Sequence, residues 1–351
     1  MEQINENLQL FSNAHGVSGY EGNIRQLLED KLKPYVDDIK VDKLGNLITT
    51  RNGSSPSIMI AAHMDEIGLM SKYIDDKGFV HFVKLGGWFD QTLHSQRVIL
   101  HTELGDIYGV IGAKPPHAMK EEERKKMVEA ENMFIDIGAK DDKDAEAMGV
   151  IPGVPITLDR EYARLANNRV TGKSFDDRAG CVLMIEAMRI ISELDVKSTV
   201  YAVGTVQEEV GLKGARTSAF GLDPDLALVT DVTVSGDHPG IEKKHSAIEI
   251  GKGPAITISD AGGRGLIATE KVIKWLKETA KQHNIDIQPE VADGGTTDAT
   301  AIHLTKCGIP SSVISVPSRY IHSPVEIVDL EDIKKGAELL ARAVESAAKF
   351  F

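Results

Sequence analysis

The sequence has only two cysteines, Cys181 and Cys307, among 351 residues, which is too few for a disulfide scaffold. Both lie in apolar context, as expected for core residues of a reduced cytoplasmic protein. There is no excess of positive charge: the formal net charge is −13, which argues against sequence-independent binding of nucleic acid. No apolar run approaches the length of a membrane span, and the polar, acidic start MEQINENLQLF is unlike a signal peptide. We therefore expect a cytoplasmic protein without nucleic-acid or membrane partners.

Repeats and low-complexity tracts are also absent, and the remaining pattern is typical of an α/β protein. Residues 57–62 are almost wholly apolar, as in a strand that is buried on both faces of a mainly parallel sheet. Residues 176–194 and 329–350 carry apolar stripes with helical spacing. Ser18 and Glu21 have the spacing of a capping box at the start of a helix. The sequence predicts a mainly parallel or mixed sheet flanked by helices.

The pattern changes near residue 67. From there, apolar and polar residues alternate and turn sequences such as DKG and LGD recur, which is typical of antiparallel, hairpin-rich structure. The α/β pattern returns after residue 163. We therefore expect a catalytic domain formed by residues 1–66 and 164–351, with a β-rich domain, residues 67–163, inserted into it.

Side chains that can bind metal follow several expected strands or precede an expected helix. Sites in open parallel sheets form at the carboxyl ends of the strands, so these side chains should gather in one crevice. They are His63 and Asp65, Asp176 and Asp177, Glu208 and Glu209, Asp231, and His322.

Several carboxylates could not sit together ionised without cations, because like charges at short range disfavour one another. Two histidines with several carboxylates suit Zn²⁺, and Co²⁺ and Mn²⁺ are equally compatible with such ligands. A single catalytic zinc takes about three protein ligands plus water, so this larger set favours two ions that share a bridging carboxylate. Neighbouring side chains at a strand end point in different directions. We therefore expect one of Glu208 and Glu209 to bind metal and the other to transfer protons.

Two further residues are candidates for substrate binding. Asp298 lies in GGTTDATAIH, where the glycines indicate close approach of the backbone to a ligand. Arg319, beside the loop that carries His322, has two interpretations: it meets a substrate carboxylate or it pairs with a protein acid.

The sequence resembles the M42 family of metallo-aminopeptidases, the tetrahedral or TET aminopeptidases that include glutamyl aminopeptidase. The resemblance extends over essentially the whole chain and departs from the family pattern at no metal or base position. The segments that carry it are AAHMDEIGLM, GKSFDDRAGC, GTVQEEVGLKGA, VTDVTVSGDHPG, GGTTDATAIH and SRYIHSP.

This resemblance implies a site with two divalent metal ions per subunit. One ion would be held by His63, Asp176 and Asp231. The other would be held by Asp176, Glu209 and His322, so that Asp176 bridges the two.

The resemblance also implies a division of the remaining roles. Glu208 would be the general base that activates the metal-bound water, and Asp65 would orient His63. Asp177 would follow the bridging residue through a cis peptide bond, as it often does in related enzymes.

The inserted domain would be PDZ-like and would mediate dimerisation. Dimers would assemble into a hollow dodecamer with inward-facing sites, and the substrates would be peptides. Members of the family differ in preferring acidic, neutral or basic N-terminal residues.

Two other functions are compatible with parts of the pattern. An endoglucanase-type glycoside hydrolase needs two carboxylates and no metal, which leaves the histidines unexplained, and two tryptophans offer few stacking platforms for sugars. A non-catalytic metal-binding scaffold would have no need of the spare carboxylate Glu208. A metal-dependent aminopeptidase accounts for more of the residues than either alternative.

Overall fold

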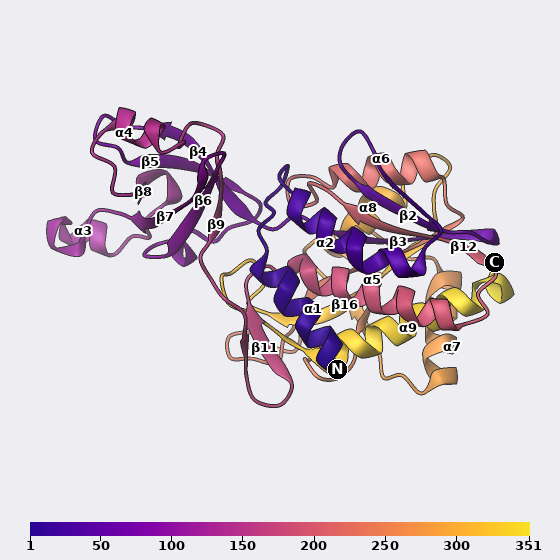
Figure 1. Ribbon diagram of the computed structural model, residues 1–351. Helices are drawn as coiled ribbons and strands as arrows, with labels where there is room; N and C mark the ends of the chain where they lie inside the picture. The colour runs from indigo at the N-terminus through magenta and orange to yellow at the C-terminus, as the bar shows by residue number, and fades with distance from the viewer.

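The computed structural model describes the backbone of residues 1–351 and the side chains of all of these except residues 116, 123 and 124. Figure 1 shows a larger α/β part that holds both chain termini and a smaller β-rich part beside it. Among the helices described, none is long and apolar enough to cross a membrane.

The larger part is built on an eleven-stranded mixed sheet. Four of its strands, in the order β12-β3-β13-β16, run parallel at the centre, and antiparallel pairs extend the sheet toward both edges. The predicted mixed sheet is therefore confirmed. Its strands are β1 (Asp38–Val41), β2 (Leu47–Arg51), β3 (Ser54–His63), β10 (Ala163–Arg164), β11 (Arg169–Gly172), β12 (Ser198–Thr205), β13 (Leu226–Val234), β14 (Ala255–Ser259), β15 (Gln288–Val291), β16 (Ser311–Arg319) and β17 (Glu326–Asp329).

Strand β3 shows why its sequence is apolar without alternation. Successive side chains of a strand point to opposite faces of a sheet. Ile58 and Ile60 belong to one buried cluster, which contains residues of α1, α2, α5, α7 and α9. Met59 and Ala61 belong to a second cluster, with residues of α6 and α8. The helices are α1 (Glu2–Asn13), α2 (Gly22–Leu32), α3 (Glu121–Arg124), α4 (Asp142–Ala147), α5 (Phe175–Glu193), α6 (Lys213–Leu222), α7 (Glu270–His283), α8 (Asp298–Ile302) and α9 (Leu330–Phe350).

The smaller part is a closed barrel with the strand order β4-β5-β8-β7-β6-β9. All its strand pairs are antiparallel, as the alternating pattern predicted. It has a hydrophobic core of its own, which includes Leu69, Leu100 and Ile135. Closure of the strands into a barrel was not predicted, because it depends on pairing between strands far apart in the chain. The strands are β4 (Gly68–Ile74), β5 (Val80–Leu85), β6 (Arg97–Thr102), β7 (Gly105–Gly112), β8 (Phe134–Asp136) and β9 (Pro155–Leu158).

Candidate active site

The central parallel strands of the large sheet have their carboxyl ends side by side, and each strand contributes to the same cluster of side chains. His63 is the last residue of β3 and lies directly opposite Thr205, the last residue of β12. The loop after Thr205 carries the two glutamates. Asp231 lies in β13, which pairs with β3, and His322 follows the end of β16. The parallel register therefore brings together residues that are far apart in the chain.

Asp176 lies between the two histidines of this cluster. Its Oδ1 is 2.9 Å from Nε2 of His63, and its Oδ2 is 3.2 Å from Nε2 of His322. Nδ1 of His63 lies 3.0 Å from the main-chain oxygen of Asp65, which leaves Nε2 to face the cluster. One carboxylate thus connects both histidines, with a different oxygen for each.

Three other carboxylates complete the cluster. Nε2 of His63 is 3.9 Å from Glu208 and 4.0 Å from Asp231, and Nε2 of His322 is 3.4 Å from Glu209. Three sets of possible ligand atoms lie within 4.8 Å of one another among the described residues. The sets are His63 with Asp176 and Asp231, Asp176 with Glu209 and His322, and His63 with Glu208 and Glu209. The third set shows that Glu208 also lies close enough to be a ligand.

The backbone around the cluster adopts conformations that non-glycine residues rarely take. Ser174, Gln207 and His322 have φ values of 56°, 56° and 60°, in the left-handed region. This region costs an L-residue roughly 1–2 kcal/mol, so the surrounding contacts must hold the backbone there. Ser174 comes two positions before Asp176, Gln207 comes directly before Glu208, and His322 belongs to the cluster itself.

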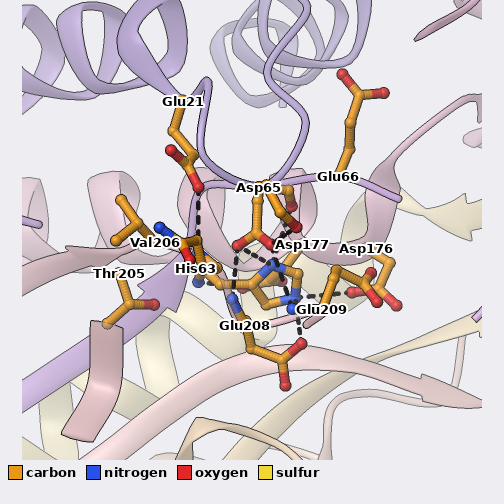
Figure 2. A network of polar contacts seen from close by, with 12 residues as sticks. Glu21, His63, Asp65, Glu66, Asp176, Asp177, Thr205, Val206, Glu208 and Glu209 are labelled. Atoms are coloured by element: carbon orange, nitrogen blue, oxygen red, sulfur yellow. Dashed lines mark hydrogen bonds and ion pairs between the residues drawn. The ribbon is translucent and has the colours of Figure 1, made fainter. Parts of the chain in front are cut away.

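Asp65 supplies some of these contacts (Figure 2). Its Oδ1 accepts the main-chain N–H of Glu208 at 2.9 Å, and its Oδ2 accepts that of Glu209 at 3.2 Å. Ser18 donates its hydroxyl to Oδ2 at 2.5 Å. The capping-box prediction for Ser18 and Glu21 was wrong, because α2 begins later, at Gly22, and Asp65 takes the serine hydroxyl. Asp65 was expected to orient His63; its contacts to the loop of both glutamates were not expected from the sequence.

Asp177 is fully buried and holds another part of the backbone. Its Oδ2 accepts the main-chain N–H of His63 at 3.2 Å, and its Oδ1 accepts that of Gly180 at 2.9 Å. The peptide bond between Asp176 and Asp177 is cis. Asp177 thus ties the start of α5 to the end of β3.

The two histidines favour their protonated forms in this setting. Burial alone would lower the pKa of His63, but the carboxylates of Glu208 and Asp176 raise it well above its usual value. Burial also opposes protonation of His322, yet hydrogen bonds to Asp176 and Glu209 raise its pKa to about 11. The pKa of Asp176 is lowered, because hydrogen bonds to both histidines outweigh its burial.

The other acids of the cluster hold their protons more tightly than usual. Burial raises the pKa of Glu209 and Asp231, and the charge of Asp176 adds to this effect. Burial raises the pKa of Glu208 well above its usual value; His63 opposes this, while Asp298 and Asp231 reinforce it. Protons and a divalent cation would therefore compete for the same oxygen atoms.

The cluster fits a metal site by the chemistry of its donors. Imidazole nitrogens and carboxylate oxygens are ligands of Zn²⁺ and related ions. Oε1 of Glu209 is a buried acceptor without a hydrogen-bond partner among the described residues. Buried polar atoms almost always have a hydrogen-bond partner. An oxygen atom that has none, and that lies among other possible ligand atoms, fits a site in which a cation is its partner.

The cluster opens into a cavity of about 1160 Å³, which is large enough for the end of a peptide. Neither candidate substrate residue is among those that line it. Asp298 is 1% exposed and accepts the hydroxyl of Thr205 at 2.5 Å, and burial raises its pKa to about 6. Arg319 pairs with Asp237 at 2.7 Å. Of the two interpretations of Arg319, the structure favours the pair with a protein acid. Asp298 does not line the cavity, and it affects the site through its charge.

Such a donor set, at the carboxyl edge of a mixed α/β sheet, is typical of the zinc-peptidase class of hydrolases. The sequence matches the M42 glutamyl aminopeptidase family over residues 45–339. The chain belongs to this family, and it is a peptidase.

Similar proteins cover nearly the whole chain. The lysyl aminopeptidase of Pyrococcus furiosus is 37% identical, over 94% of this chain and 93% of its own length. The solved structure of aminopeptidase APDkam598 from Desulfurococcus kamchatkensis is 45% identical, covers 98% of this chain and 94% of its own, and has a TM-score of 0.92. That of the Pyrococcus horikoshii TET1 peptidase, described as able to form a tetrahedron or a large octahedral shell, is 34% identical, covers 97% and 99%, and has a TM-score of 0.88.

Proposed function

We propose that the protein is an aminopeptidase with two divalent metal ions per chain, which hydrolyses the N-terminal residue from peptides. The observation that carries this proposal is the position of Asp176, whose two oxygens face two different histidines at 2.9 and 3.2 Å. This is the arrangement that a carboxylate bridging two ions requires.

The proposed ligands form two sets that share one residue. His63, Asp176 and Asp231 would hold one ion, and Asp176, Glu209 and His322 the other. Zn²⁺, Co²⁺ and Mn²⁺ all suit nitrogen and oxygen donors of this kind. When bound, such ions polarise a carbonyl group and lower the pKa of water.

Glu208 is the proposed general base. Its side chain is 10% exposed and lies 3.9 Å from His63, so it is close to the cluster and still accessible from the cavity. It would take a proton from the attacking water and pass it to the leaving amine. The side chain of Asp65 would keep Glu208 in place by accepting the main-chain N–H of Glu208. The main-chain oxygen of Asp65 would keep the ring of His63 turned toward the cluster. A free carboxylate near the ions would bind the ammonium group of the substrate.

We further propose that residues 67–163 form a PDZ-like dimerisation domain inserted into a catalytic domain of residues 1–66 and 164–351. Dimers would assemble into a dodecamer around an internal space. The assembly of the similar TET1 peptidase into closed shells supports this proposal. Unfolded peptides would enter such a space, while folded proteins would remain outside.

An amino-acid anilide assay tests the proposed reaction. The metal-free protein, reloaded in turn with Zn²⁺, Co²⁺ and Mn²⁺, should hydrolyse a panel of free aminoacyl p-nitroanilides. It should not cleave their N-acetylated counterparts, because an aminopeptidase needs the free ammonium group. Hydrolysis of soluble cellulose instead would support the glycoside hydrolase, and metal binding without any hydrolysis would support the scaffold.

A further inference from the structure

Glu326 is a buried carboxylate outside the proposed ligand set that contacts the backbone of two proposed ligands. Its side chain is 1% exposed. Its Oε2 accepts the main-chain N–H of Asp176 at 3.1 Å, and its Oε1 accepts that of His322 at 3.0 Å. We propose that Glu326 is a positioning residue that fixes Asp176 relative to His322 and so forms the site of the second ion. This inference depends on the two-metal site proposed above.

The position of Glu326 in the sheet explains how it reaches both residues. It is the first residue of β17, which is hydrogen-bonded to β16 on one side and to β11 on the other. It lies opposite Gly172, the last residue of β11, shortly before Asp176 in the chain. On the other side, the loop that carries His322 leads directly into Glu326. Glu326 thus stands on a paired strand between the two segments that carry these ligands.

Both segments need an external acceptor. The N–H of Asp176 belongs to the first turn of α5, where no earlier carbonyl of the helix is available to it. The backbone of Asp176 is also non-helical, with φ −79° and ψ 104°. His322 has a left-handed φ of 60°, which a non-glycine residue keeps only when its surroundings impose it. Glu326 accepts the N–H groups of both residues.

The same kind of contact, a buried carboxylate that accepts main-chain N–H groups, occurs elsewhere around the cluster. Asp65 accepts the main-chain N–H groups of Glu208 and Glu209, and Asp177 accepts that of His63. Each acceptor is a buried carboxylate that is absent from the proposed ligand set. With Glu326 included, three such carboxylates hold the backbone of five of the six proposed ligand and base residues. Glu326 therefore extends to His322 and Asp176 the kind of backbone contact that already holds His63, Glu208 and Glu209.

Two acceptor oxygens are essential to this role. A carboxylate offers two acceptors, whereas an amide offers one acceptor and one NH₂ donor. In Glu326→Gln, the shape is kept but one backbone N–H faces the NH₂ group and loses its partner. The matched control is Asp332→Asn, because Asp332 is also fully buried and accepts two main-chain N–H groups, of Gly251 and Gly253, away from the cluster.

Metal binding measures the effect without any substrate. Metal-free wild-type protein and both variants are titrated with Co²⁺, followed by calorimetry and by the visible absorption of the bound ion. We expect at least one of the two binding steps to weaken about 10–100-fold in Glu326→Gln, the usual range for partners that orient a ligand. Asp332→Asn should bind both ions as the wild type does. A folded Glu326→Gln protein that binds both ions with wild-type affinity would overturn the proposal.

Amide hydrogen exchange gives a second test that needs no metal. In the metal-free wild type, the N–H groups of Asp176 and His322 should exchange slowly, and one of them should become fast in Glu326→Gln. Unchanged exchange at both would also overturn the inference. If Glu326→Gln does not fold, Glu326→Asp keeps the charge but is one methylene shorter, and it should lose one of the two contacts with the same consequences. Wild-type protein that binds a single ion would refute the two-metal function instead, so the two failures are distinguishable.

Discussion

The carboxylate of Asp65 accepts the main-chain N–H of Glu208 at 2.9 Å, although the two residues are 143 positions apart in the chain. This bond joins the turn after β3 to the loop after β12, at the edge where both strands end. Because Asp65 binds the main chain of Glu208, the carboxylate of Glu208 takes no part in this hydrogen bond. Glu208 can therefore be placed accurately and still exchange a proton, which is what a general base requires.

Glu208→Gln should lower kcat by at least about a hundredfold, the usual scale for the loss of a general base. The substitution keeps the shape and the main-chain contact to Asp65 but removes the group that accepts a proton. Metal content, measured by elemental analysis, should stay at the wild-type level. Glu331→Gln, on the surface of α9, is the control and should leave both quantities unchanged. Loss of metal together with activity would make Glu208 a ligand, as its proximity to His63 and Glu209 also permits.

Asp176→Ala should remove both ions or leave them weakly bound, because Asp176 is the residue that the two proposed ligand sets share. The wild type should hold two ions per chain at saturation. Elemental analysis after dialysis against metal-free buffer measures both proteins. Asp237→Ala is a useful comparison, since it removes the partner of Arg319 outside the cavity and should keep the metal content. A fully active enzyme with one ion per chain would contradict the two-metal site.

The sequence predicted that these side chains gather because most of them stand at or near the ends of apolar strands, while Asp176 stands at the start of a helix. His63, Glu208 and Asp231 each occur at or near the end of such a strand, and parallel strands end at the same edge. The pattern of β3 also predicted burial on both faces, which the two hydrophobic clusters confirm.

The contacts that hold the cluster in place could not be predicted from the sequence. Ser18 fits a helix-capping pattern, but its hydroxyl is bound by Asp65, 47 positions away in the chain. Glu326 stands at the start of a short strand, between the apolar residues Val325 and Ile327, and nothing in the local sequence indicates its partners. These partners, Asp176 and His322, are set by tertiary structure. Arg319 had two interpretations from sequence, and only the position of Asp237 distinguishes them. Side-chain hydrogen bonds between distant segments have no periodicity that a sequence could reveal.

Mild acid should weaken the contact between the barrel and the α/β part. The ring of His15 stacks on that of His101 in β6, with ring centroids 3.8 Å apart. Burial, and then the proximity of His101, lower the pKa of His15 below its usual value of 6.5. The unfolded chain therefore binds this proton more readily than the folded one. The contribution to stability is present above about pH 6.5 and is lost as the pH falls through the lower folded pKa.

Urea unfolding of the metal-free protein at about pH 7.5 and about pH 5 measures this loss. Other groups titrate over the same range, so the comparison is between variants. The free energy of unfolding should fall less with acid in His15→Gln than in the wild type, while His94→Gln, an exposed position of the barrel part, should behave as the wild type does. Equal acid dependence in wild type and His15→Gln would show that the stacked pair has no such effect.

The last prediction concerns assembly. The barrel contributes none of the proposed ligands, yet it exposes large apolar side chains, among them Tyr73, Leu104 and Tyr108, which are 58%, 75% and 66% exposed. A part without ligands and with apolar surface suits contacts between subunits. The chain has a mass of 38.1 kDa, so twelve copies would give about 460 kDa, in a closed symmetric assembly of the kind that oligomers favour.

Light scattering on the metal-loaded protein should therefore give about 460 kDa, or dimers in equilibrium with that species, and removal of metal should shift the balance toward dimers. The shift is expected because the ligand loops lie beside the barrel: His322 Nδ1 is 3.1 Å from the main-chain oxygen of Gly87. Loss of the ion would leave the ring of His322 with one contact fewer, although Glu326 still holds its main-chain N–H, and would so weaken the contact of this ring to the segment between β5 and β6. A single monomeric species at micromolar concentration would contradict the enclosed compartment. The proposed active site would remain, because one chain supplies every member of the cluster, and a monomer should still cleave a small aminoacyl anilide.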